Sequence, residues 1–243
     1  EVPLHGLVVL EGPPGTGKTS LARGLASKVA RSLSGAKMHY LEVEPHGLAS
    51  GQLGRSQQAV RNLLSGVVAE RANLGPLVVV LDEVETLAAD RQRLSLEANP
   101  VDVHRATDAV LAQLDHLALE HPNILIIATS NFPQAIDRAF MSRADLVMNI
   151  GLPNAKACTK ILQDTLKGLA RAVPEIGKLA HAQELAQLGK QCVGLDGRRI
   201  RKLVLSALAH SRELAAAPEK LTVGELKEAI RHATAGLAKE SIK

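Results

Sequence analysis

Several residues near the start of the chain have the types and the spacing that hold a phosphate group. Gly12, Gly17, Lys18 and Thr19 complete the pattern GxxxxGK[ST], and Gly15 adds a further glycine inside it. Glycine accepts backbone angles that a Cβ forbids, so several N–H groups can turn toward one anion. The Lys18 ammonium can reach the β- and γ-phosphates of a nucleotide, and the Thr19 hydroxyl can bind Mg²⁺. The segment therefore predicts a site for ATP with Mg²⁺.

The motif lies between an apolar strand pattern and an amphipathic helix pattern, which disfavours the alternative of a Gly/Pro-rich surface turn. The helix that follows also directs the positive end of its dipole at the same anion. The nucleotide contacts predicted from this segment are Gly12, Pro13, Pro14, Gly15, Thr16, Gly17, Lys18, Thr19 and Ser20.

Two adjacent carboxylates, Asp82 and Glu83, follow directly after the apolar segment VVVL. Parallel strands deliver their C-terminal residues to the ligand crevice of a sheet. Asp82 can hold Mg²⁺ through water, which makes Thr19 and Asp82 the predicted metal-binding residues. Glu83 can polarise a water for attack on the γ-phosphate. The alternative is a helix N-terminus, where acidic residues are favoured; we interpret Glu85, slightly further along, as structural.

The segment ILIIATSN ends at Asn131. An amide at this tip, between the phosphate-loop strand and the acidic strand, can hold the attacking water or detect the γ-phosphate. Ser130 and Asn131 are also good helix caps, and the two roles can coexist.

Strand and helix patterns alternate along the first part of the chain, which predicts an α/β fold with a parallel sheet. The expected strands are Leu7–Glu11, Met38–Glu44, Leu77–Asp82, Ile124–Thr129 and Leu146–Ile150. The expected helices are Lys18–Leu33, Gln57–Ala72, Glu83–Arg93, Val103–Glu120 and a short one near Pro133–Phe140, with a loop at Leu94–Val101. After the boundary near Gly151–Asn154 only helices are expected: Ala155–Ala172, Ala182–Gln191, Gly197–Leu214 and Val223–Gly236. We thus expect a nucleotide-binding domain at residues 1–152 and a helical lid at 153–243.

Composition narrows the class of protein. Of the 243 residues, 46% are hydrophobic but only two are Phe, one is Tyr and none is Trp, so the core is aliphatic and base-stacking platforms for single-stranded nucleic acid are disfavoured. The net charge of +4 reflects a mixed, solvated surface. Cys158 and Cys192 form no metal or disulfide pattern, and no signal peptide or membrane-spanning run is present, which together predict a cytoplasmic protein without a membrane partner. The chain begins with Glu1, so we expect a fragment or an additional N-terminal portion.

Taken together, the phosphate loop, the acidic strand end, the polar strand tip and the helical lid resemble the AAA+ ATPases. Within this resemblance Ile136–Asp145 matches the segment that carries an arginine finger, a residue that reaches a neighbouring subunit's nucleotide. Arg143 matches the finger, and Arg138 is the weaker candidate; an ordinary surface arginine is the alternative. In the lid, Arg198 matches the second sensor, which links lid position to the nucleotide.

The chain resembles the pachytene-checkpoint ATPases over roughly residues 6–210. The resemblance rests on the motif around Asp82, the TSN tip, SRAD followed closely by IGLP, and GRRIRKL. These proteins remodel HORMA-domain partners, and the Ala-, Leu- and Arg-rich composition favours a bacterial member. Bacterial relatives accompany HORMA proteins and nucleotide-cyclising enzymes in anti-phage operons. The family's central pore loop matches Ala49–Arg55, where Gly51, Gln52 and Leu53 replace the family's aromatic grip; a Gly-rich turn is an equal alternative. The family's N-terminal adaptor-binding domain has no counterpart in this sequence.

The resemblance implies an ATP-hydrolysing ring, expected to be a hexamer, that remodels or partly unfolds a HORMA-domain protein. ATP would lie between Lys18 and Thr19 of one subunit and Arg143 of the next. Two alternatives remain open. One is a nucleic-acid-processing module of the clamp-loader or helicase-loader type, which would use the positive charge on phosphates. The other is an ATP-binding scaffold without turnover.

Overall fold

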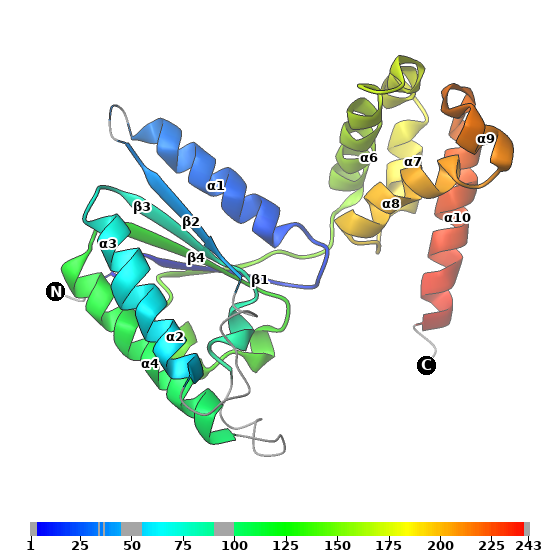
Figure 1. Ribbon diagram of the computed structural model, residues 1–243. Coiled ribbons are helices and arrows are strands. Elements are labelled where there is room, and N and C mark those ends of the chain that lie inside the picture. Colours follow the sequence, from blue (N-terminus) through cyan, green and yellow to red (C-terminus); the bar gives the residue numbers. More distant parts are fainter. Residues whose placement is uncertain (1–3, 34, 36, 45–54, 90–99, 241–243) are drawn as a thin grey trace. The chain divides into compact units, whose positions relative to one another are not determined.

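The computed structural model describes residues 4–33, 35, 37–44, 55–89 and 100–240. The chain packs as two compact units (Figure 1). The first consists of Glu1–Pro13 and Lys18–Ile150, and the second of Pro14–Gly17 and Gly151–Lys243. Each unit has its own cluster of buried apolar side chains and is described by itself.

The first unit is built on a five-stranded sheet in which all neighbouring strands are parallel, in the order β2-β3-β4-β1-β5. Its strands are β1 (Leu7–Glu11), β2 (His39–Val43), β3 (Leu77–Leu81), β4 (Ile124–Ser130) and β5 (Leu146–Asn149). The predicted fold class is confirmed, and each predicted strand is present within one residue at either end. Because β4 lies between β3 and β1, the C-terminal ends of these three strands are adjacent.

Helices cover both faces of this sheet (Figure 1). Helix α1 (Lys18–Ser32) packs on one face, where Ala22 and Ala26 contact side chains of the central strands. The opposite face is covered by a group of helical segments: α2 (Arg55–Arg61), a π-helix (Asn62–Val68), α3 (Ala69–Ala72) and α4 (Pro100–Glu120). Gln57–Ala72 is thus helical as predicted, but its middle turns are wound as a π-helix, a form that is rare in such a long run.

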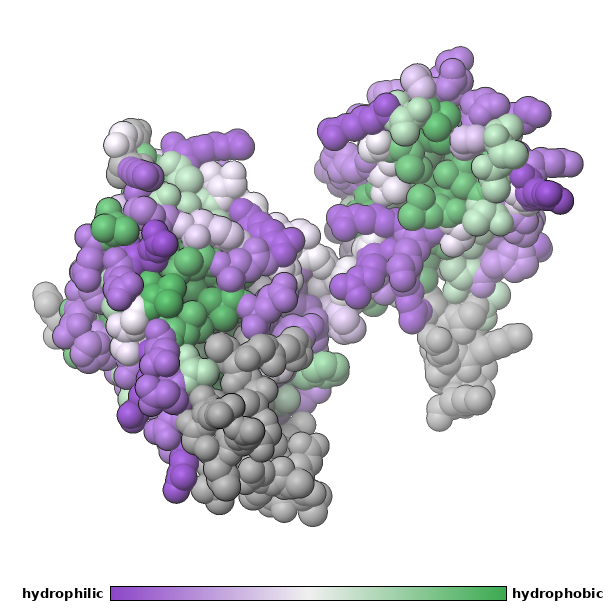
Figure 2. All heavy atoms as spheres, viewed as in Figure 1, coloured by the Kyte–Doolittle hydropathy of each residue, from purple (hydrophilic) through white to green (hydrophobic). Residues whose placement is uncertain are grey.

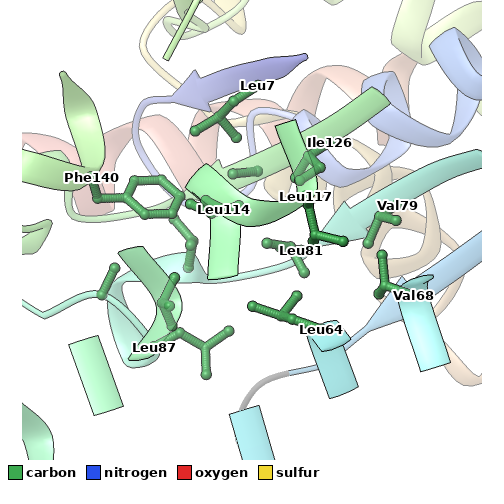
Figure 3. Packing of buried hydrophobic residues seen from close by; sticks show 14 of the residues in the cluster. Leu7, Leu64, Val68, Val79, Leu81, Leu87, Leu114, Leu117, Ile126 and Phe140 are labelled. Atoms are coloured by element: carbon green, nitrogen blue, oxygen red, sulfur yellow. The ribbon is translucent and has the colours of Figure 1, made fainter. Parts of the chain in front are cut away.

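Strand β3 shows why the sheet could be recognised from sequence. All five of its residues are buried. Leu77, Val79 and Leu81 pack in the cluster on the side of α2 and α4, where Figure 3 shows Val79 and Leu81. Val78 and Val80 pack on the other face, with Ala22 and Ala26 of α1. A parallel strand covered on both faces has no polar side to alternate with, so it is an uninterrupted apolar run.

The predicted helix Glu83–Arg93 is wrong in its described part. Only a 3-10 turn at Val84–Thr86 forms there. Glu83 has a left-handed backbone with φ 52°, and Ala89 pairs with Ile136 as an isolated antiparallel bridge. The carbonyl of Ala88 also accepts a hydrogen bond from the backbone N–H of Asp137 at 2.8 Å. This non-local pairing replaces the helical hydrogen bonds that the sequence pattern favours.

Two further boundaries differ from the prediction. Helix α4 begins at Pro100, three residues before the expected start, which places the end of the predicted loop Leu94–Val101 inside the helix; residues 94–99 lie outside the described part of the chain. Proline suits a first helical position because its missing N–H has no partner there anyway. The short helix expected near Pro133–Phe140 is a 3-10 turn at Pro133–Ala135 followed by α5 (Arg138–Met141).

The second unit contains helices and no strand in its described residues (Figure 1). Its elements are α6 (Ala155–Leu169), a 3-10 segment (Pro174–His181), α7 (Leu185–Gln191), α8 (Gly197–Leu208), α9 (Arg212–Ala216), a 3-10 turn (Pro218–Lys220) and α10 (Val223–Glu240). The predicted helix Gly197–Leu214 is two helices, because the Ser211 hydroxyl caps α9 by accepting from the N–H of Leu214 at 3.1 Å. Cys158 and Cys192 are both free and buried in the core.

Hydrophilic side chains make up much of the surface visible in Figure 2, with smaller hydrophobic areas between them. None of the helices in the described part of the chain is both long enough and apolar enough to cross a membrane.

Helices α6 and α7 approach each other so closely at Gly189 that a side chain there would collide with Thr159. A Cβ on Gly189 would lie 2.0 Å from Thr159 Oγ1 and 2.9 Å from the Thr159 backbone nitrogen. We predict that Gly189→Ala lowers the stability of the protein by about 1–3 kcal/mol, as overpacking does.

Gly168→Ala is the matched control. Gly168 is also helical, but a Cβ there would meet nothing within 4 Å, so the change should raise stability by up to about 1 kcal/mol. Thermal melting followed by circular dichroism compares the two, and equal melting temperatures would show that the α6–α7 contact is looser than described.

Candidate functional site

The C-terminal ends of β1, β4 and β3 bring together the residues that the sequence singled out. Lys18 follows the loop after β1, Asn131 follows β4, and Asp82 and Glu83 follow β3. The sheet order places Asn131 between the other two groups, as predicted. These side chains are joined by hydrogen bonds and form the candidate site.

Lys18 is the centre of the site. Its residue is only 5% exposed, and its Nζ donates to the carbonyls of Gly12 and Pro13 at 2.9 Å and to Asn131 Oδ1 at 2.8 Å. These bonds match the three donors of an ammonium. Burial lowers the pKa of the Lys18 ammonium, while the nearby carboxylates, Glu85 first among them, act in the opposite direction. An anion beside this group would favour its charged form.

The loop before Lys18 needs glycine for two physical reasons. Gly12, Gly15 and Gly17 have φ values of 146°, 78° and 96°, which L side chains rarely adopt. A Cβ on Gly12 would also lie 2.2 Å from the carbonyl oxygen of Ile150. The loop therefore keeps its backbone turned in the way a phosphate cradle requires. The other predicted loop contacts are exposed (Pro13, Pro14, Ser20) or half-buried (Thr16, Thr19).

The two predicted metal-binding residues lie side by side. The Thr19 hydroxyl donates to Asp82 Oδ1 at 2.8 Å. A hydroxyl and a carboxylate oxygen are the hard donors that Mg²⁺ prefers, and Mg²⁺ in nucleotide sites takes only one or two protein ligands besides phosphates and water. No group of three or more His, Cys, Asp or Glu side chains that could hold a metal occurs among the described residues. The donor set thus fits Mg²⁺ bound together with a nucleotide.

Asn131 connects Lys18 to Glu83. Its Oδ1 accepts from Lys18, and its Nδ2 donates to Glu83 Oε1 at 3.0 Å. Glu83 itself has the one positive φ among the described non-glycine residues. A carboxylate and an amide in contact can orient one water molecule between them and a phosphate.

Two residues of the site were not identified from the sequence. Thr129 is 1% exposed; its hydroxyl donates to Asp82 Oδ1 and accepts from the backbone N–H of Glu83 at 3.3 Å. Glu85 Oε1 accepts from the backbone N–H of Asn131 at 3.1 Å, and its Oε2 is buried without a partner among the described residues. That contact suits a structural role for Glu85, but its charge also acts on Lys18. For Thr129, the sequence feature that could have indicated the role is a hydroxyl inside an otherwise apolar strand pattern.

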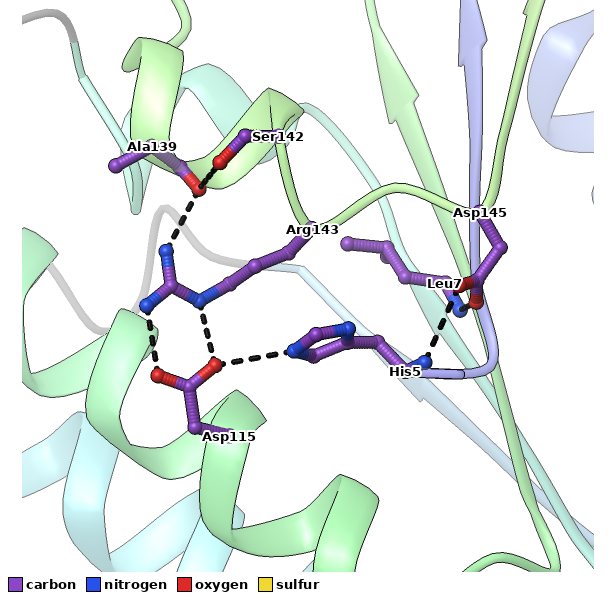
Figure 4. Close-up of polar contacts among 7 residues, drawn as sticks. All are labelled: His5, Leu7, Asp115, Ala139, Ser142, Arg143 and Asp145. Carbon is purple, nitrogen blue, oxygen red and sulfur yellow. Dashed lines mark hydrogen bonds and ion pairs between the residues drawn. The ribbon is translucent and has the colours of Figure 1, made fainter. Parts of the chain in front are cut away.

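Arg143 is not near Lys18 in the same chain. It precedes β5, whose first residue pairs with Val8 near the beginning of β1, whereas the phosphate loop follows the end of that strand. The length of β1, roughly 16 Å for its five residues, separates them. Arg143 instead contacts Asp115 of α4 and the Ala139 carbonyl (Figure 4). These hydrogen bonds hold the pKa of Asp115 below its usual value and raise that of Arg143.

The remaining predicted residues lie elsewhere. Arg138 is exposed at the start of α5. Arg198 belongs to the second unit, in the first turn of α8, where Asp196 Oδ1 accepts from its backbone N–H at 2.9 Å and its side chain is exposed. Gly51, Gln52 and Leu53, the predicted pore loop, lie outside the described residues.

Comparison with known proteins agrees with this geometry. The family model described as "ATPase family associated with various cellular activities (AAA)" matches residues 8–152. CD-NTase-associated protein 6 of Pseudomonas aeruginosa is 60% identical over 232 residues, which cover 96% of this chain and 76% of that protein. A pachytene checkpoint protein 2 homolog of Danio rerio is 35% identical, and the match covers 84% of this chain but 53% of the relative, about half its length.

A solved structure titled as an E. coli HORMA:CdnC:Trip13 complex contains a chain with the same fold. It superposes with a TM-score of 0.68 at 20% sequence identity, over 93% of this chain and 73% of that chain.

We predict that Thr129→Val weakens Mg²⁺-dependent nucleotide binding. The methyl group preserves volume, but Asp82 keeps only the Thr19 hydroxyl as a side-chain donor and the N–H of Glu83 loses its bond to Thr129, and each lost hydrogen bond costs about 0.5–1.5 kcal/mol. The Mg²⁺ concentration needed for half-maximal binding of a fluorescent ATP analogue should rise by on the order of tenfold, and Thr129→Ser, which keeps the hydroxyl, should stay close to the native value.

Thr107→Val is the control. Thr107 is equally buried, in α4, and its hydroxyl has no partner among the described residues, so its loss should leave binding unchanged. If Thr129→Val binds Mg²⁺ and nucleotide as the native protein does, Thr129 has no part in arranging the acidic pair.

Proposed function

The chain belongs to the AAA family of ATPases, and we propose that it hydrolyses ATP in order to remodel a HORMA-domain protein. The observation that carries the proposal is the chain of hydrogen bonds from Lys18 through Asn131 to Glu83, next to the Thr19–Asp82 pair. A lysine, an amide, a carboxylate and a hydroxyl–carboxylate pair at one sheet edge are the parts that phosphoryl transfer to water requires.

Each residue has a defined task in this reaction. The backbone N–H groups of the glycine loop and the Lys18 ammonium bind the β- and γ-phosphates. Thr19 and Asp82 would hold Mg²⁺, which neutralises phosphate charge when bound. Asn131 orients a water; Glu83 accepts its proton as the water oxygen bonds to the γ-phosphorus and the bond to ADP breaks. Lys18 also donates to the carbonyls of Gly12 and Pro13 and to Asn131 Oδ1, so phosphate oxygens would compete with these acceptors for its three N–H donors.

The position of Arg143 supports a ring. An arginine that stabilises charge on a γ-phosphate can raise the rate by three or more orders of magnitude, and it can be supplied by a neighbouring molecule. Because β1 separates Arg143 from Lys18 of its own chain, a second subunit is needed to complete the site. We therefore propose a homo-oligomeric ring, with six subunits, in which residues 153–243 act as the lid and Arg198 responds to the nucleotide.

The partner is proposed from the comparisons and the motifs. The relative of highest identity reported above is named as associated with a CD-NTase, and a chain of the same fold occurs in a complex with a HORMA protein. Gripping of a flexible partner segment is assigned to Gly51, Gln52 and Leu53. We propose a bacterial anti-phage context on the same likeness, and a cytoplasmic location with it. The nucleic-acid-processing alternative has no comparable support among these relatives.

The proposal predicts that Glu83→Gln binds ATP but neither hydrolyses it nor remodels the partner. The amide keeps the shape of the side chain but cannot take a proton, so turnover should fall by on the order of 10²–10⁴-fold. ATP affinity, phosphate release and hydrogen exchange in a HORMA-domain protein mixed with the ATPase provide the three readouts.

Glu70→Gln, at an exposed position of α3, makes the same chemical change away from the site and should behave as the native protein. Native ATP hydrolysis by Glu83→Gln would refute the catalytic assignment. Hydrolysis by the native protein that never alters exchange in the HORMA protein would instead refute the remodelling function.

A further inference from the structure

Asp115 joins three segments that are distant in the sequence. Its Oδ1 accepts from Arg143 Nε at 2.7 Å and lies 3.1 Å from His5 Nε2, and its Oδ2 accepts from Arg143 Nη2 at 2.6 Å. Figure 4 shows the carboxylate of α4 meeting the guanidinium edge on, with the imidazole on its other side. This is the bidentate geometry in which arginine and carboxylate form their strongest pairs.

The hydrogen bonds fix the whole guanidinium group. Besides the two bonds to Asp115, Nη1 donates to the Ala139 carbonyl at 2.8 Å. Arginine has five N–H donors in one rigid plane, so these bonds leave one N–H on each terminal nitrogen for a further acceptor. Two parallel donors on one edge match two oxygens of a phosphate group.

Arg143 lies in the short connection between α5 and β5, where its backbone N–H donates to the Phe140 carbonyl at 3.1 Å, but this bond does not order its long side chain. The backbone of this connection is tied at its far end, where Asp145 accepts from the N–H groups of His5 and Leu7 at 3.2 and 2.9 Å. The long side chain of Arg143 has many rotamers, and ordering it on binding is unfavourable. Asp115 lies on a 21-residue helix and accepts two of the three hydrogen bonds that hold the end of this side chain.

Solvent exposure limits what the pair adds to stability. The Asp115 side chain is 45% exposed and that of Arg143 is 22% exposed, so water screens part of the attraction, although the bidentate geometry retains some of it. Its geometric order is better explained by what the arginine must reach. A carboxylate on an arginine can act in two opposite ways, however: it can hold the group in a useful orientation, or it can withhold it from another anion.

We infer that Asp115 is a positioning residue for Arg143, which it orders for the nucleotide site of the adjacent subunit. The inference rests on the proposed function of Arg143 and goes beyond it by assigning the residue that supports it. It predicts that removing the carboxylate impairs the neighbour's turnover and leaves nucleotide binding by the altered subunit itself unchanged.

The test begins with Asp115→Ala, compared with Arg143→Ala, at saturating ATP. Turnover of Asp115→Ala should fall on the order of tenfold to a hundredfold, the effect expected when a reacting group is displaced. The KM for ATP should stay near the native value, the melting temperature should be unchanged, and Asp115→Glu should recover part of the activity. Glu120→Ala, which removes another exposed carboxylate from α4, should have native turnover. Asp115→Asn replaces Asp115→Ala if the latter does not fold.

Mixed oligomers then locate the defect. Asp115→Ala subunits mixed with Glu83→Gln subunits form interfaces in which both groups are intact, and activity should partly return. When Asp115→Ala subunits are mixed with Arg143→Ala subunits, no interface has both groups intact, and activity should stay low. The double variant Asp115→Ala/Arg143→Ala should be no slower than Arg143→Ala alone. The inference is overturned if Asp115→Ala has native turnover while Arg143→Ala is impaired. It is also overturned if Asp115→Ala turns over ATP faster than the native protein. Native turnover of Arg143→Ala overturns the proposed role of that arginine as well.

Discussion

A buried ammonium group needs oxygen partners on every side, and this requirement organises the site. Lys18 has almost no access to water, so carbonyls of the loop, the amide of Asn131 and the field of three carboxylates take its place. Asn131 in turn donates to Glu83, and the Thr129 hydroxyl is hydrogen-bonded to the Asp82 carboxylate and to the backbone N–H of Glu83. Replacing any one of these groups therefore changes the hydrogen bonds or charges around Lys18, so substitutions in the site are expected to be coupled.

The parallel sheet makes this arrangement possible and also limits it. Three adjacent strands end at the same edge and bring the loop, the amide and the acidic pair together without any long side chain having to reach across. The same topology places Arg143 at the opposite end of β1. In the proposed ring, Arg143 would therefore reach the γ-phosphate of an adjacent subunit and not that of its own chain, which would couple catalysis to assembly.

The part of this structure that sequence could predict is the part governed by local pattern. Strands buried on both faces appear as continuous apolar runs, and the residues of the phosphate-binding motif can be identified from their fixed spacing. What could not be predicted depends on non-local contacts: Thr129 with Asp82 across 47 positions, Arg143 with Asp115 across 28, and the bridge of Ala89 with Ile136 that replaces a predicted helix. Glu85 was judged from its place near a helix pattern, and only the folded chain shows its carboxylate beside Asn131.

Binding of nucleotide phosphate by Lys18 can be measured by calorimetric titration of the native protein and of Lys18→Ala with ATP and Mg²⁺. Loss of a buried, charge-assisted donor should weaken binding at least about a hundredfold, equivalent to about 2.7 kcal/mol. Lys28→Ala, at an exposed position of the same helix, should bind ATP as the native protein does. Equal ATP affinity of folded Lys18→Ala and native protein would contradict this account of the site.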